Sequence, residues 1–89
     1  MRARLTAQFE RAYANAPERV RRDFDKQVRL LVIHGHRYPS LRVHPWPADG
    51  PDAVQAYVNK QWRFYYYVDG DTYVIYRIQA HPKTTQRGR

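Results

Sequence analysis

The chain lacks cysteine entirely and has only four glycines and one methionine among its 89 residues. Without cysteine it forms no disulfide and offers no thiolate for catalysis or metal binding, which suits a reducing cytoplasm. Its longest strongly apolar run, residues 30–33, is far shorter than the roughly 20 residues that cross a bilayer. No apolar region follows the start of the chain, so we expect no signal peptide, no membrane partner and a cytoplasmic location.

Acidic residues are also scarce. Eight Asp and Glu stand against sixteen Lys and Arg, which gives a formal net charge of +8. No acid lies between Lys26 and Ala48, and none follows Asp71. So large an excess favours a polyanionic partner, nucleic acid above all, although a merely soluble basic surface would have the same composition.

Side chains that bind metals do not cluster along the sequence. His34 and His36 flank Gly35 without a third ligand nearby, and the acids fall on predicted helices or turns. The two histidines are better explained as caps of a helix that ends there. We therefore predict no metal ion and no other cofactor.

Aromatic residues are abundant, and they gather in residues 57–83. Strand-forming residues on both sides of a turn at residues 69–71 predict a β-hairpin. A three-residue loop would place Val68 opposite Thr72 and bring Arg63 opposite Arg77, whereas a two-residue loop would separate the two arginines. In the first register the core face of the hairpin carries Phe64, Tyr66, Val68, Val74, Tyr76 and Ile78, and the other face carries Arg63, Tyr65, Tyr67, Tyr73 and Arg77.

Before the hairpin, apolar residues recur first at helical and then at strand spacing. Capping residues and prolines mark where the elements begin and end. We expect a possible strand at residues 2–5, a helix capped by Thr6, a second helix that starts at Pro17 and ends at Gly35, and strands at residues 41–46 and 53–58.

This order predicts an α+β fold. A helical hairpin, possibly after a short strand, would pack on one face of a four-stranded, mainly antiparallel sheet. One domain would span residues 1–81, followed by a basic flexible tail at residues 82–89. The other face of the sheet then stays open, and its aromatic and guanidinium groups suit stacking on bases and pairing with phosphates.

Two stretches carry a family pattern: YPSLRVHPW at residues 38–46 and AYVNKQWRFYYYVDGDTYVIYRIQAHP at residues 56–82. With the helical hairpin before them, they resemble the RelE/ParE superfamily of toxins from bacterial type II toxin-antitoxin systems over nearly the whole chain. The turn before Arg63 is similar to the family's Arg-(Val/Ile)-x-x-(Tyr/Trp)-Arg pattern, with Tyr57 in place of the first arginine. The resemblance implies a cognate antitoxin that covers the basic, aromatic cleft and the helical hairpin.

The resemblance leaves the activity open between two branches, because members of the RelE branch cut mRNA on the translating ribosome and members of the ParE branch poison DNA gyrase. We favour an mRNA endonuclease (mRNA interferase) that inhibits translation, with the ribosome and mRNA as partners. A gyrase poison and a non-catalytic nucleic-acid-binding module are the alternatives. The nuclease needs no metal if a base deprotonates the ribose 2′-OH, a cation holds the charge on phosphorus and an acid protonates the leaving 5′-oxygen.

Catalytic roles implied by the resemblance fall on Arg63, for the scissile phosphate, and on His44 and His81, for proton transfer. Arg77 is a second phosphate clamp if it stands opposite Arg63. The chain departs from the family at His44, where lysine is common, and it has no tyrosine after His81, so a member that has lost cleavage would look the same. The residues expected to bind RNA are Arg42, Lys60, Tyr65, Tyr67, Tyr73 and Lys83.

Overall fold

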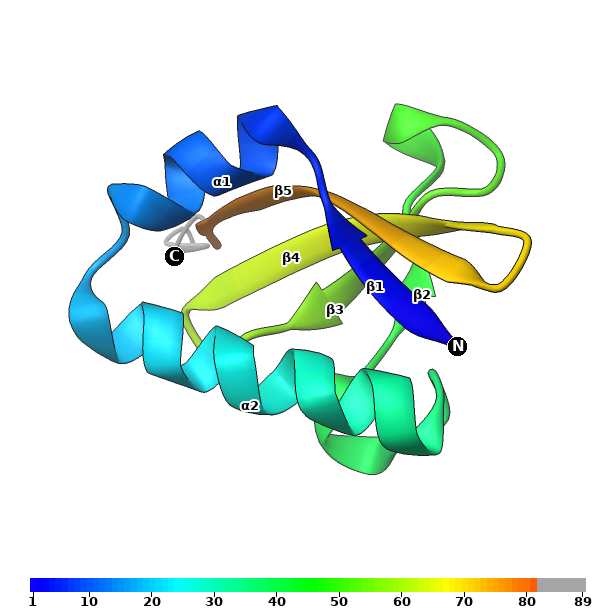
Figure 1. Ribbon diagram of the computed structural model, residues 1–89, viewed down its shortest axis with the longest axis horizontal. Coiled ribbons are helices and arrows are strands. Elements are labelled where there is room, and N and C mark those ends of the chain that lie inside the picture. The colour runs from blue at the N-terminus through cyan, green and yellow to red at the C-terminus, as the bar shows by residue number, and fades with distance from the viewer. Residues whose placement is uncertain (82–89) are drawn as a thin grey trace, which may run out of the picture.

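A computed structural model describes residues 1–81 as an α+β fold (Figure 1). Strand β1 (Arg2–Leu5) leads into helix α1 (Ala7–Ala14), and helix α2 (Glu18–His34) follows after a sharp corner. The remaining elements form most of the sheet. Lys83 and the tail predicted at residues 82–89 lie outside the described residues.

Capping residues, a proline and a glycine mark the ends of the two helices. The hydroxyl of Thr6 accepts a hydrogen bond from the backbone N–H of Phe9 at 3.1 Å and so caps α1. Pro17 precedes α2, and Gly35 ends it with a φ of +85°, which residues with a Cβ rarely adopt. The predicted helices are confirmed, with Pro17 as the N-cap residue of α2 rather than its first helical residue.

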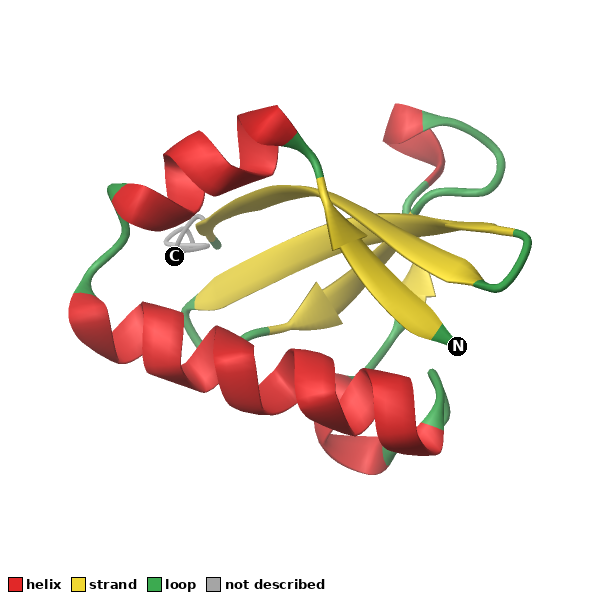
Figure 2. Ribbon diagram, viewed as in Figure 1, coloured by secondary structure: helices red, strands yellow, loops and turns green. Residues whose placement is uncertain are grey.

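The sheet has five strands in the order β1-β5-β4-β3-β2. Strands β3 (Val54–Tyr57), β4 (Trp62–Asp69) and β5 (Thr72–Ala80) form an antiparallel meander, and β1 joins its edge parallel to β5. Figure 2 shows α1 and α2 diverging from their corner, with the yellow sheet running between them in this view. The predicted α+β fold is confirmed, and the possible strand at residues 2–5 is present as a fifth strand that makes the sheet mixed.

Aromatic rings join the helices to one face of the sheet. The ring centroid of Phe24 lies 4.8 Å from that of Phe9 and 5.2 Å from that of Phe64, and all three side chains are buried. Such pairs stabilise packing beyond the area they bury. The same cluster contains Val20, Leu31, Leu41, Ala56, Val58, Tyr66, Tyr73, Ile75 and Ile78.

The strand predicted at residues 41–46 is wrong in extent. Strand β2 consists of His44–Pro45 alone, between the 3₁₀ helices η1 (Pro39–Leu41) and η2 (Pro47–Asp49). Prolines within and after β2 lack the N–H that a longer ladder requires. Arg42, directly after η1, has a φ of +45°, in the left-handed region that few non-glycine residues occupy. The segment therefore turns where an extended strand was expected.

The hairpin turn is shorter than predicted. Asp69 pairs with Thr72, so only residues 70 and 71 lie in the turn, with a φ of +62° at Gly70. A two-residue turn with a left-handed glycine matches the right-handed twist of the flanking strands. The predicted three-residue loop, with Val68 opposite Thr72, is therefore wrong.

A β-bulge then changes the register further along the hairpin. Tyr66 pairs with Ile75, and the preceding residue Tyr65 pairs with Arg77. Tyr76 is the extra residue between these two pairs, so it and Arg77 both come to the face opposite the helices. Strand β5 thus places consecutive side chains on the same face at this one point.

Because of the shorter turn and the bulge, several hairpin residues lie on a different face from the one predicted. Phe64, Tyr66 and Ile78 lie in the core as predicted. Tyr73 was predicted on the open face but belongs to the core, and Tyr76 was predicted in the core but leaves it. Of the two valines predicted on the core face, Val68 is 51% exposed and Val74 is buried outside the helix-facing cluster. Arg63 pairs with Gln79 rather than with Arg77.

One buried polar side chain ties α2 to the part of the sheet described next. The Nε2 of Gln27 donates to the carbonyl of Tyr57 at 2.8 Å and to that of Ser40 at 3.0 Å. Its Oε1 accepts from the Ser40 hydroxyl at 3.2 Å. Because Gln27 is only 6% exposed, water cannot easily replace these bonds. The glutamine therefore sets the distance from α2 to both β3 and η1.

Replacing Gln27 with Leu should lower the free energy of unfolding by about 1–3 kcal/mol, because two carbonyls lose their buried donor. Urea denaturation followed by circular dichroism measures the change. Gln8→Leu, at an exposed position of α1, is the matched control and should shift the free energy by less than about 0.5 kcal/mol. Equal effects of the two substitutions would contradict a structural role for Gln27.

Candidate functional site

The candidate site lies on the sheet face opposite the helices, which we call the second face. Cross-strand pairing arranges its side chains in two neighbouring rows across β2 to β5. This arrangement brings three of the four predicted catalytic residues, His44, Arg63 and Arg77, onto one face. The first row is His44, Gln55, Tyr65 and Arg77, and the second is Tyr57, Arg63 and Gln79.

Arg63 is on this face but is turned inward. It is only 5% exposed, and its guanidinium carbon lies 3.6 Å from the ring centroid of Tyr57. Its Nη1 donates to the carbonyls of Asn59, Lys60 and Trp62 at 2.8, 3.1 and 3.2 Å. Arg63 therefore holds together the turn between β3 and β4. Within residues 1–81 its buried Nε has no hydrogen-bond partner.

Arg42 approaches the same aromatic ring from another segment. Its guanidinium carbon lies 5.6 Å from the Tyr57 centroid, and the residue is exposed. The left-handed backbone at Arg42 turns the chain at this point, two residues before β2 begins at His44. Neither Arg42 nor Arg63 forms a salt bridge with an acid of the described residues. Two cations thus share one tyrosine with no counter-charge beside them.

Tyr65, predicted to stack on bases, is covered. Its side chain is 1% exposed, its ring centroid lies 5.5 Å from that of Trp46, and its hydroxyl accepts hydrogen bonds from Gln55 at 2.9 Å and Gln79 at 3.3 Å. Trp46 begins the connection between β2 and β3, residues 46–53, which we call the strap. Because the strap lies over this part of the second face, Tyr65 supports its neighbours and has no free ring face for a base.

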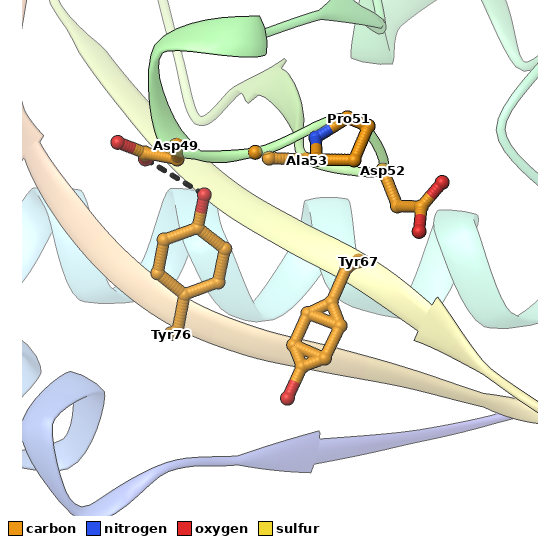
Figure 3. Close-up of a pocket in the computed structure, with 7 residues that line it drawn as sticks. Asp49, Pro51, Asp52, Ala53, Tyr67 and Tyr76 are labelled. Atoms are coloured by element: carbon orange, nitrogen blue, oxygen red, sulfur yellow. Dashed lines mark hydrogen bonds between the residues drawn. The ribbon is translucent and has the colours of Figure 1, made fainter.

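Arg77 is held between the sheet and the strap. Its guanidinium carbon lies 4.5 Å from the Tyr65 centroid, and its Nη2 forms an ion pair with the carboxylate of Asp49. The same carboxylate accepts a hydrogen bond from the Tyr76 hydroxyl at 2.7 Å (Figure 3). Burial raises the pKa of Tyr76, so this hydroxyl stays protonated and remains a donor. The predicted pairing of Arg77 with Arg63 is replaced by an internal salt bridge.

The two predicted histidines occupy opposite ends of the site. His44 is exposed in β2, and its Nδ1 lies 3.2 Å from the Arg42 carbonyl. His81 follows β5, is exposed, and donates its backbone N–H to the carbonyl of Gln61 at 2.7 Å. The exposed Lys60 precedes Gln61 in the turn that Arg63 stabilises. His81 and Lys60 therefore lie beyond the second row, beside the turn between β3 and β4 and on the side away from the first row.

The remaining expected RNA contacts have different surroundings. Tyr67 is 36% exposed on the second face, whereas Tyr73 is 3% exposed in the core, with its ring centroid 5.3 Å from that of Tyr66. Tyr73 cannot contact RNA without unfolding of the core. Lys83 lies outside the described residues.

Two contributors were not expected from the sequence. Tyr57, which supports both Arg63 and Arg42, could have been found from the alternation along residues 53–58, since it shares a face with Gln55. Asp49 gave no signal, because its segment has ordinary turn composition.

Residues 1–81 contain neither a cluster of metal-binding side chains nor a membrane-spanning helix. No group of three or more His, Asp or Glu side chains in this range is placed to hold a metal ion. None of the helices there combines the length and apolar character needed to span a bilayer.

Arg63→Met should lower the free energy of unfolding by about 2–4 kcal/mol, because three carbonyls lose a charged donor. Arg42→Met removes a cation from the same ring but at an exposed position, so it should cost less than about 1 kcal/mol. Chemical denaturation compares the two variants. In Arg63→Met, trypsin should also cut faster after Lys60, since the turn is less restrained. Equal stability of the two variants would refute the structural role of Arg63.

Comparison with known proteins gives matches only at the level of structure. No protein-family model matches the chain, and no curated protein matches it by sequence. Solved structures do match over most of their length, at 12 to 17% identity.

Three of these structures illustrate the similarity. YafQ from E. coli strain BL21(DE3) has a TM-score of 0.74 and 16% identity, covering 88% of this chain and 90% of its own. The YoeB dimer from Staphylococcus aureus has a TM-score of 0.75 and 12% identity, covering 92% and 98%. Archaeal RelE, in complex with RelB from Pyrococcus horikoshii OT3, has a TM-score of 0.72 and 17% identity, covering 89% and 92%. The chain therefore has the fold of the RelE/ParE superfamily of toxins.

Proposed function

We propose that this chain is the toxin of a toxin-antitoxin pair and that it cuts mRNA on the ribosome without a metal ion. The fold and the net charge of +8 support this class of function. A fold alone does not select an activity, so the proposal depends on the second face.

The observation that carries the proposal is the pair of cations on Tyr57. Arg42 and Arg63 both contact this ring, and neither has a salt-bridge partner among the described residues. Fixed positive charge without a counter-charge favours an anion, and it stabilises the extra negative charge that develops on phosphorus during RNA cleavage. Arg42 is exposed and can contact the phosphate directly. Arg63 keeps its hydrogen bonds to the turn and contributes charge from below.

His44 is the proposed base. A backbone carbonyl only accepts hydrogen bonds, so the 3.2 Å contact with the Arg42 carbonyl requires the neutral ring to carry its proton on Nδ1. The lone pair is then on Nε2, which can take the proton from a ribose 2′-OH. The same contact joins the base to Arg42, whose guanidinium would hold the phosphate.

His81 lies beyond the second row on the β5 side, farther from His44 than Arg77 is. It therefore cannot act as the acid on the phosphate that His44 serves and is proposed to contact a neighbouring phosphate. In the proposed reaction the 2′-oxygen attacks phosphorus, the bond from phosphorus to the 5′-oxygen breaks, and that oxygen takes a proton from water. The products are a 2′,3′-cyclic phosphate and a free 5′-hydroxyl. Lys60 precedes Gln61, whose carbonyl accepts the His81 N–H, and it is proposed to contact the same neighbouring phosphate.

An antitoxin is the proposed protein partner. RelE, YafQ and YoeB have been solved in complexes with RelB, DinJ and YefM. An antitoxin that covers the second face and the helical hairpin would shield the uncompensated cations on Tyr57 and prevent access of RNA.

A gyrase poison is the second candidate. It is favoured by the engagement of Arg63 with backbone carbonyls and of Arg77 with Asp49, because both arginines are then occupied in the free chain. A protein that acts only by binding would not need them to contact a phosphate.

Primer extension on a defined mRNA, in a purified translation system with and without ribosomes, tests the nuclease. His44→Asn should reduce cutting by about 10²–10⁴-fold, the usual contribution of an acid-base group. Arg42→Gln should also reduce it. His36→Asn and Arg29→Gln, which change exposed residues away from the second face, are the matched controls and should leave cutting unchanged. Arg63 variants are avoided because loss of folding would imitate loss of catalysis.

Undiminished cutting by His44→Asn would remove the acid-base assignment. No cutting by the wild-type chain, together with gyrase-dependent double-strand breaks in DNA, would replace the nuclease with the gyrase poison.

A further inference from the structure

Asp49 is an acid inserted among cations and aromatic rings of a basic protein. Its carboxylate binds Arg77 and the Tyr76 hydroxyl, and the side chains of Asp49 and Arg77 are only 22% and 29% exposed. In each of the other salt bridges of residues 1–81 at least one side chain is 70% exposed or more. This contact is therefore the most sheltered ion pair of the described chain, and sheltered pairs are screened less by salt.

The two donors to Asp49 are held in place before any ligand arrives. The Arg77 guanidinium stacks over Tyr65, and the Tyr65 hydroxyl is in turn held by Gln55 and Gln79. Tyr76 is placed beside Arg77 by the β-bulge. A fixed guanidinium and a fixed hydroxyl directed at one point bind an anion well, because little entropy is lost on binding. In the free chain that anion is a carboxylate of the protein itself.

We expect displacement of Asp49 to move its side chain alone, because the backbone of the strap is held by its own hydrogen bonds. The strap is closed by hydrogen bonds from the N–H of Trp46 to the Ala53 carbonyl at 2.8 Å and from the N–H of Asp49 to the Trp46 carbonyl at 3.1 Å. Figure 3 shows Asp49 and Tyr76 at one side of a pocket of about 420 Å³ that Tyr67 and Asp52 also line. This pocket offers room for the released carboxylate and gives a ligand access to the Tyr76 hydroxyl.

We propose that Arg77 and Tyr76 form a second RNA phosphate site, which Asp49 occupies in the free chain and from which an RNA phosphate displaces it. The inference rests on the proposed function, since the ligand is an RNA strand. Arg77 and His44 stand in the same row on β5 and β2, three strand spacings or roughly 14 Å apart. Arg77 therefore receives a phosphate other than the one that is cut.

The exchange has a consequence for selectivity. A phosphate that enters replaces the Asp49 carboxylate, so the site exchanges one anion for another. An anion that is not also held elsewhere on the protein therefore gains little affinity from this site. An RNA strand already held at Arg42 presents its next phosphates at high local concentration and can compete with Asp49. The site thus favours a strand that runs along the whole row over one that touches only a part of it.

The test measures binding of a single-stranded, fully 2′-O-methylated oligoribonucleotide, which cannot be cut, by fluorescence anisotropy. Asp49→Asn should bind roughly three- to tenfold more tightly than Asp52→Asn, which removes the same charge from the same pocket without freeing Arg77. The slope of log affinity against log salt should be steeper by about 0.7 in Asp49→Asn, for one more phosphate contact. In the Arg77→Gln background, Asp49→Asn should give no gain.

Equal binding by Asp49→Asn and Asp52→Asn, or a gain that persists with Arg77→Gln, overturns the second phosphate site and leaves the proposed nuclease intact. Failure of every variant and of the wild-type chain to bind the RNA also overturns the second phosphate site, and the primer-extension assay then decides separately on the nuclease. Thermal denaturation checks that each variant is folded. If Asp49→Asn unfolds, Asp49→Ser, which also removes the charge, is compared with Asp52→Ser in the same way.

Discussion

The register between β4 and β5 decides what each face of this small protein can do. A two-residue turn at Gly70 sets the first pairs, and the bulge at Tyr76 shifts the later ones by one residue. Because of the bulge, Ile75 and Ile78 both reach the core while Tyr76 and Arg77 both leave it. With an unbroken ladder Ile75 and Ile78 would lie on opposite faces, so the core would lose one of them, and the register that kept Ile75 in the core would also remove Arg77 from the second face. Packing of the helices and chemistry of the second face therefore depend on the same irregularity.

Arginines on this face differ in availability, and their partners account for the difference. Arg63 is engaged by carbonyls of its own turn, Arg77 by a carboxylate of the strap, and Arg42 by neither. Net charge alone would treat the three as equal. Desolvation makes a buried guanidinium costly to leave unpaired, so the two sheltered ones have internal acceptors and the exposed one does not. Any anion that arrives meets Arg42 first.

Much of the fold was predictable because its signals are local. Thr6 and Gly35 mark helix ends through their own side chain or backbone, and the aromatic hairpin is marked by its turn and composition. The site was less predictable because its contacts are not local. No residue next to Tyr76 in the sequence marks it as the site of a bulge. Asp49, which accepts the hydrogen bond from its hydroxyl, is 27 residues away in the chain. The burial of Arg63 could not be anticipated either, since its acceptors are backbone carbonyls, which every sequence possesses.

Parallel pairing of β1 with β5 makes the order of synthesis relevant to folding. β1 is the first strand to be made, and its partner is the last strand of the described chain. The helices and the meander can form earlier from contacts that are closer in sequence, but β1 stays unpaired until β5 has been translated. A nascent chain in which β5 is not yet made thus carries an incomplete sheet. Completion of the fold, and with it the second face, is delayed until β5 has left the ribosome.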